Sequence, residues 1–108
     1  MAQVIQAHMA LTQSVLAKIA QTDNRWDISG DVVIGAVPAL LEASKSLSII
    51  DHATVDFANV TDIDTSTISL IFEWKRRAKK ENQPLKFVNL PANLTTLTQL
   101  YGVAELIN

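Results

Sequence analysis

The stretch from residue 53 to residue 81 constrains the fold of this chain more than any other, because a strand passes there directly into a long helix. Ala53 to Phe57 is mostly apolar and β-favouring. After Thr65 the apolar side chains recur at helical spacing, at Ile68, Ile71, Phe72 and Trp74. The hydroxyl groups of residues 65–67 therefore fall at a helix start, with its unpaired N–H groups and positive dipole end. Such a position suits a phosphate, a capping side chain or a hydroxyl presented to a partner.

Strands and helices alternate along the rest of the chain. The pattern predicts strands at residues 14–21, 25–29, 53–57 and 85–88, and helices at residues 38–46, 65–81 and 92–101. Turn residues 22–24 join the first two strands as a hairpin, and Gly102 closes the last helix. We therefore expect an α/β fold with a central, roughly four-stranded mixed sheet, parallel crossover units and helices packed on it. In such sheets, sites gather at the carboxyl ends of strands, where residues 62–67 lie.

The first residues allow two interpretations. We predict an N-terminal extension over residues 1–13, helical over its length, followed by a single domain at residues 14–108. A stripe at helical spacing also fits one longer amphipathic helix, from Val4 to Leu16 or beyond, in place of the first strand. The stripe consists of Ile5, Met9, Thr12, Leu16 and Ile19. The residue pattern alone does not choose between the two.

The composition narrows the class of protein. The chain has 108 residues, 48% of them hydrophobic, and no cysteine, which indicates one globular domain and excludes a disulfide scaffold and thiolate metal sites. A formal net charge of −2 argues against nucleic acid as the main partner. No apolar run approaches the roughly 18 residues of a membrane helix, and the N-terminus lacks the pattern of a signal peptide. We therefore expect a cytoplasmic protein.

The central segment resembles the STAS domain family, which includes anti-sigma factor antagonists, sulfate-transporter tails and the small cytoplasmic subunit of the Mla phospholipid transporter. The VDF sequence at residues 55–57 matches the strand of the family pattern, and Val60 and Ile63 match its loop hydrophobics. Asp64-Thr65 matches its pair of an aspartate and a hydroxyl residue. Thr67 stands where the family commonly has glycine, so a β-branched side chain occupies the point where a partner backbone would approach. The resemblance implies a STAS-like (SpoIIAA-like) α/β domain.

The C-terminal part indicates a branch of this family. The run Leu94-x-x-Leu97-x-x-Leu100-Tyr101-Gly102-Val103, followed by Leu106-Ile107, is similar to the ending of Mla-type STAS subunits. The resemblance implies a non-enzymatic subunit that binds and stabilises or regulates the ATPase of a phospholipid-transporting ABC transporter. Such a transporter maintains outer-membrane lipid asymmetry, and the subunit would lie at the inner face of the inner membrane through its partner.

Two other functions stay open. One is an anti-sigma factor antagonist that binds an anti-sigma factor or serine kinase and is switched by phosphorylation at Thr65 or Ser66. The other is a substrate-binding or NTP-binding domain.

The candidate contact site begins with Asp62, Asp64, Thr65 and Ser66. Asp64 suits the N-cap of the long helix, where backbone N–H bonds to the carboxylate contribute about 1 kcal/mol. The resemblance maps the family's phosphorylated hydroxyl onto Thr65, with Ser66 as a second possible phosphoacceptor. First-turn hydroxyls also commonly bond to nearby backbone. We predict contact with a partner rather than phosphorylation, because the two aspartates would repel a phosphate that the helix start otherwise favours.

The long helix carries two apolar faces. One contains Thr67, Leu70, Trp74 and Arg77, and the other contains Ile68, Ile71, Phe72 and Ala78. We predict that the second face is buried and that the first faces outward, as a partner-binding patch in which Leu70 and Trp74 are rimmed by Thr67 and Arg77. The alternative is that the whole apolar arc belongs to the core.

The sequence gives little support for enzyme chemistry. It contains no HExxH, P-loop, GxGxxG or nucleophile elbow, and His8 and His52 stand alone. Asp62 and Asp64 with Thr65 give a weak cation-binding signal, which a capped and solvated turn also explains. The basic run at residues 75–80 complements the helix dipole from a solvated face. We predict no catalytic residue, cofactor or metal site, so any ATP hydrolysis belongs to the partner.

Overall fold

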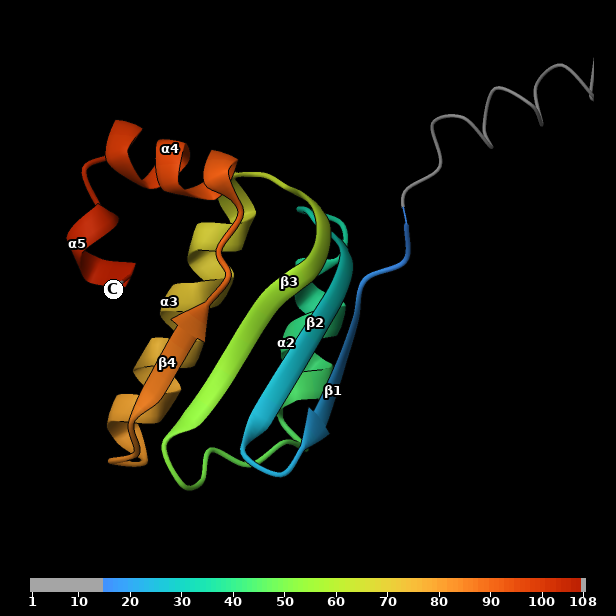
Figure 1. The fold of residues 1–108 in the computed structure, drawn as a ribbon, viewed down its shortest axis with the longest axis vertical. Coiled ribbons are helices and arrows are strands. Elements are labelled where there is room, and N and C mark those ends of the chain that lie inside the picture. Colours follow the sequence, from blue (N-terminus) through green and yellow to red (C-terminus); the bar gives the residue numbers. More distant parts are fainter. Residues whose placement is uncertain (1–14, 108) are drawn as a thin grey trace, which may run out of the picture.

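The computed structural model describes residues 15–107, which form one sheet covered by helices. Its elements are β1 Lys18–Thr22, β2 Arg25–Val32, α2 Val37–Ser44, β3 Ala53–Ile63, α3 Thr65–Lys80, β4 Leu85–Val88, α4 Ala92–Leu100 and α5 Ala104–Ile107. The four strands lie in the order β1-β2-β3-β4, with α2 and α3 on one face of the sheet and α4 near the start of α3 (Figure 1). The four-stranded mixed sheet expected from the sequence is confirmed. The helix predicted at residues 1–13 lies outside the described residues.

The sheet combines one antiparallel pair with two parallel pairs. β1 and β2 form the predicted hairpin, and Asp23 in its turn has a positive φ of 55°. β2 pairs with β3 and β3 with β4 in parallel, through crossovers that contain α2 and α3. Because Ile19 pairs with Ile28 in the hairpin, a single helix extending through Ile19 is wrong.

β2 and β3 run further than the sequence pattern predicted. β3 continues to Ile63 rather than ending at Phe57, through the polar stretch that we expected to be a loop. Its register against β2 shifts twice, between Asp27 and Ser29 and between Gly30 and Asp31, and β3 has one extra residue at each shift. Such bulges break the alternation of apolar and polar residues by which a strand is recognised. β2 likewise extends to Val32, so α2 begins at Val37, with Pro38 in its first turn as expected.

The core lies between the sheet and its two covering helices. The core-facing strand residues are Trp26, Ile28, Val32, Ala53, Val55 and Phe57, and each is at most 1% exposed. α3 contacts α2 on one side and α4 on another, so it buries a wide arc against them and the sheet. Ile68, Ile71 and Ala78 are buried as predicted, and Phe72 is half-buried. No helix within residues 15–107 is long and apolar enough to cross a membrane.

The C-terminal elements follow the prediction until residue 102. β4 matches its predicted range, and α4 ends at Leu100, one residue before its predicted end. Gly102 takes the positive φ of 69° that suits a residue following a helix end. The short helix α5 follows and buries Ile107, and the sequence pattern did not predict it.

Candidate partner-binding site

The site begins with a capping box at the start of α3. The Asp64 carboxylate accepts a hydrogen bond from the Ser66 N–H at 2.8 Å, and the Thr67 hydroxyl accepts one from the Asp64 N–H at 3.2 Å. The Thr67 hydroxyl also donates to the Val32 carbonyl at 2.6 Å. The predicted N-cap role of Asp64 is confirmed, and the cap joins the start of α3 to the end of β2.

Asp64 also holds the connection between β2 and α2. Its second carboxylate oxygen accepts a hydrogen bond from the Ile34 N–H at 2.9 Å. Partial burial acts to raise the pKa of Asp64, but the hydrogen bonds from the Ser66 side chain and from the backbone of Ile34 and Ser66 outweigh it. The pKa of Asp64 therefore lies below its ordinary value. Both of its oxygens accept hydrogen bonds from the chain, so this carboxylate joins the β2–α2 connection to the start of α3.

The two candidate hydroxyls differ in accessibility. Thr65 is exposed, and its hydroxyl forms no hydrogen bond to any group within residues 15–107. Ser66 is half-buried, and its hydroxyl donates to the Asp64 carboxylate. Asp62 is exposed on the neighbouring end of β3. Thr65 is therefore the more accessible of the two candidate hydroxyls, and the exposed Asp62 precedes it by three residues.

Thr67 does not stand on the surface where the resemblance placed it. Its side chain is 0% exposed and is directed toward Val32, so it leaves the approach to the helix start open. The spacing of Asp64 and Thr67, three residues apart, is the capping-box signal that could have revealed this role from the sequence.

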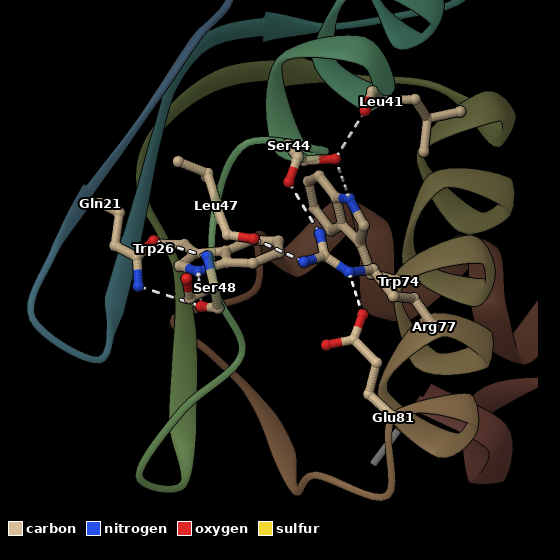
Figure 2. A network of polar contacts seen from close by, with 9 residues as sticks. All are labelled: Gln21, Trp26, Leu41, Ser44, Leu47, Ser48, Trp74, Arg77 and Glu81. Atoms are coloured by element: carbon tan, nitrogen blue, oxygen red, sulfur yellow. Dashed lines mark hydrogen bonds and ion pairs between the residues drawn. The ribbon is translucent and has the colours of Figure 1, made fainter.

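The prediction of an outward-facing stripe on α3 is wrong. Leu70 is 0% and Trp74 1% exposed, and the Trp74 ring meets Trp26 edge to face at 5.6 Å between centroids. The Trp74 N–H donates to the Ser44 hydroxyl at 2.9 Å (Figure 2). The alternative interpretation, in which the whole apolar arc is core, holds because α2 covers this side of α3.

Arg77 is half-buried rather than the rim of a patch. Its guanidinium donates to the Ser44 carbonyl at 2.7 Å and to the Leu47 carbonyl, and it lies 5.6 Å from the Trp26 ring (Figure 2). It also pairs with Glu81 one turn later on α3. Arg77 thus joins the end of α2 to α3. Neither Arg77 nor the buried residues Thr67, Leu70 and Trp74 belong to the candidate contact surface.

Asp56, the middle residue of the VDF strand, has a structural environment. It is 2% exposed and forms an ion pair with Arg25. It also accepts hydrogen bonds from the Asn89 side chain at 3.0 Å and the Ala58 N–H at 2.8 Å. Burial acts to raise the pKa of Asp56, but these hydrogen bonds and the Arg25 charge lower it below its ordinary value. Asp56 therefore links β2, β3 and the turn after β4.

The described residues offer little for metal chemistry. No group of three or more histidine, aspartate or glutamate side chains within residues 15–107 is placed to hold a metal ion. What the helix start offers is an exposed hydroxyl on a hydrogen-bonded backbone, three residues after the exposed Asp62.

Comparison with known proteins gives the family. A family model described as "Mlab, STAS domain" matches residues 9–108. The chain belongs to the STAS domain family. STAS domains are typically non-enzymatic regulatory domains that interact with partner proteins. A search of curated proteins gives no match.

Solved structures share the fold of this STAS domain. The Bacillus cell fate determinant SpoIIAA in its phosphorylated form is 15% identical, with a TM-score of 0.57 over 82% of this chain and 86% of that one. The anti-sigma factor antagonist SpoIIAA in its unphosphorylated form is also 15% identical, with a TM-score of 0.60 over 82% of this chain and 83% of that one. At this identity the likeness establishes a SpoIIAA-like fold.

Proposed function

We propose that this STAS domain is the accessory subunit of an Mla-type phospholipid-transporting ABC transporter and binds its ATPase through the surface around Thr65. The observation that carries the proposal is the exposed Thr65 hydroxyl, held at a rigidly capped helix start in a chain that matches a family model described as "Mlab, STAS domain". The transporter would keep outer-membrane lipid asymmetry. The subunit would sit at the inner face of the inner membrane through the ATPase.

The mechanism is one of preorganised binding. Hydrogen bonds from the Ile34 and Ser66 N–H groups to Asp64, and from the Asp64 N–H to Thr67, fix the backbone around Thr65 before a partner arrives. A surface that is already ordered loses little conformational entropy on association. The subunit would regulate the ATPase only to the extent that it binds one state of the ATPase more tightly than another.

A second candidate function has its own support. The fold matches SpoIIAA in both its phosphorylated and its unphosphorylated form, and Thr65 is accessible to a kinase. An anti-sigma factor antagonist switched by phosphate at Thr65 is therefore the alternative. Ser66 suits this role less well than Thr65, because its hydroxyl already donates to Asp64 and is half-buried.

Co-purification tests the proposal. The tagged wild-type chain, expressed in its native cells, should recover an ABC ATPase, identified by mass spectrometry. Thr65→Glu should reduce the recovered ATPase by roughly tenfold, because a longer side chain, whose carboxylate must lose its water on binding, replaces the small hydroxyl at the contact surface. An acidic residue in the first turn of a helix stabilises it, so this loss would not reflect unfolding.

Thr22→Glu is the matched control. Thr22 is an exposed threonine at the end of β1, beside the hairpin turn and at the opposite end of the sheet from the start of α3 (Figure 1), so the substitution adds the same charge away from the Thr65 surface. It should recover the ATPase as well as the wild type does. Recovery of a serine kinase or anti-sigma factor instead, with substantial phosphate on Thr65, would replace the transporter proposal by the antagonist.

A further inference from the structure

An apolar face lies beside the Thr65 surface and belongs to none of the contacts described so far. Val15, Leu16 and Ile34 are 56%, 72% and 75% exposed. Together with Gly35 and Ala36, which precede α2, they define what we call the Ile34 face. A shallow groove of about 480 Å³ is lined by Val15, Leu16, Val33, Gly35 and Ala36 among others, and Ile34 stands between two of these residues in the chain.

The backbone under this face is fixed. The Val15 N–H donates to the Asp31 carboxylate at 2.8 Å, and the Val15 carbonyl accepts from the Asp31 N–H at 2.9 Å. The Leu16 carbonyl packs so closely on Gly30 that a Cβ at residue 30 would lie 2.2 Å from its oxygen. Large apolar side chains are therefore held in contact with water by an ordered backbone. Such a surface is suited to burial against a partner at little entropic expense.

The Ile34 face is continuous with the Thr65 surface. The carboxylate of Asp64 accepts one hydrogen bond from the Ile34 N–H and another from the Ser66 N–H. Ile34 and Thr65 thus lie on either side of one capping residue. A protein that contacts Thr65 over an interface of ordinary size would extend onto one of its neighbouring surfaces.

Charge indicates what kind of molecule covers this face. Asp31 and Asp62 lie directly opposite each other on β2 and β3. Asp31 accepts hydrogen bonds from Val15 and Thr61, but neither carboxylate forms an ion pair with any group in residues 15–107. Like charges directly opposite on neighbouring strands are unfavourable, and a cation supplied from outside would offset them. The same carboxylates would repel an anionic lipid surface, which makes a protein the better match.

We propose that the ATPase bound at Thr65 also covers the Ile34 face, with a segment that combines an apolar side chain for the groove with a lysine or arginine for Asp31 and Asp62. This inference rests on the proposed function. The apolar part of the interface is then the Ile34 face, which includes the β2–α2 connection, and not the buried stripe on α3.

A matched pair of variants tests it, with the affinity for the purified ATPase as the measurement. Ile34 and Leu100 are both 75% exposed, but Leu100 lies at the end of α4 rather than on the Ile34 face. Ile34→Glu should weaken binding by about tenfold or more, whereas Leu100→Glu should change it by less than about twofold. Asp62→Asn should weaken binding and reduce its dependence on salt. Unfolding midpoints of all three variants should stay close to the wild type, because each residue is exposed.

The outcomes separate this inference from the proposed function. If the wild-type chain binds no ABC ATPase, the proposed function fails and this inference fails with it. If the wild type binds and Thr65→Glu weakens binding while Ile34→Glu does not, the function stands and the Ile34 face is overturned. A loss of binding with Leu100→Glu alone would overturn it too, since the partner would cover the α4 side. Binding to anionic phospholipid vesicles that Ile34→Glu abolishes would overturn the choice of a protein occupant.

Discussion

Replacing Trp74 by alanine should destabilise the domain without acting directly on its partner surface. Trp74 is 1% exposed, and its ring packs edge to face on Trp26 with an interplanar angle of 87°. Truncating a buried tryptophan costs about 3–5 kcal/mol, which includes the cavity left behind. About 0.5–1.5 kcal/mol of that total comes from losing the aromatic pair with Trp26. The Ser44 hydroxyl keeps its hydrogen bond to the Leu41 carbonyl at 2.7 Å, so no buried polar group is left unpaired.

The expected loss is large relative to the stability of a small domain. Domains of this size are stable by about 5–15 kcal/mol, so Trp74→Ala should remove a substantial fraction and lower Tm by roughly 12 °C or more. Urea unfolding followed by far-UV circular dichroism measures this loss of stability without relying on the deleted fluorophore. Trp74→Phe is the control, because phenylalanine keeps most of the apolar packing and should lower the free energy of unfolding by less. An unfolding midpoint equal to wild type, together with weakened partner binding, would refute the burial argument and restore Trp74 as an interface anchor.

Three further substitutions test the site and its supports. Thr67→Gly introduces the residue common in the family and removes half of the capping box. It should lower the free energy of unfolding, measured in urea, by about 1–2 kcal/mol, whereas Thr67→Ser should retain most of the stability. Gly30→Ala should clearly lower the melting temperature, since Gly30 has a φ of +85° and the new Cβ would meet the Leu16 carbonyl. Gly35→Ala is the control and should be nearly neutral, because no atom lies within 4 Å of the Cβ it would add. Because the folded pKa of Asp56 is lowered, its contribution to stability is present above its unfolded pKa of about 3.9 and is lost as the pH falls through the lower folded value. Asp56→Asn should therefore flatten the acid limb of a plot of unfolding free energy against pH, and an unchanged limb would contradict the assignment.

The sequence by itself determined the elements whose signals are local. Asp64 was predicted as N-cap because a cap bonds to N–H groups two or three residues away, and Gly102 as a helix end because only its own φ is involved. The order of strands and helices then gave the mixed sheet, since parallel neighbours require crossover helices. The same local rules placed Thr65 in the first turn of α3, because it is the first residue after the cap.

Only the tertiary structure decided which side chains reach the surface. Helical periodicity showed that α3 has a wide apolar arc, but not that α2 covers the Trp74 side of it and turns Arg77 inward to the Ser44 and Leu47 carbonyls. The bulges in β3 and the hydrogen bond from Ile34 to Asp64 join residues about thirty positions apart, and no pattern within one segment encodes them. The apolar part of the proposed interface therefore moved from the Trp74 side of α3 to the β2–α2 connection, because burial is a property of packed neighbours rather than of the helix that carries the residue.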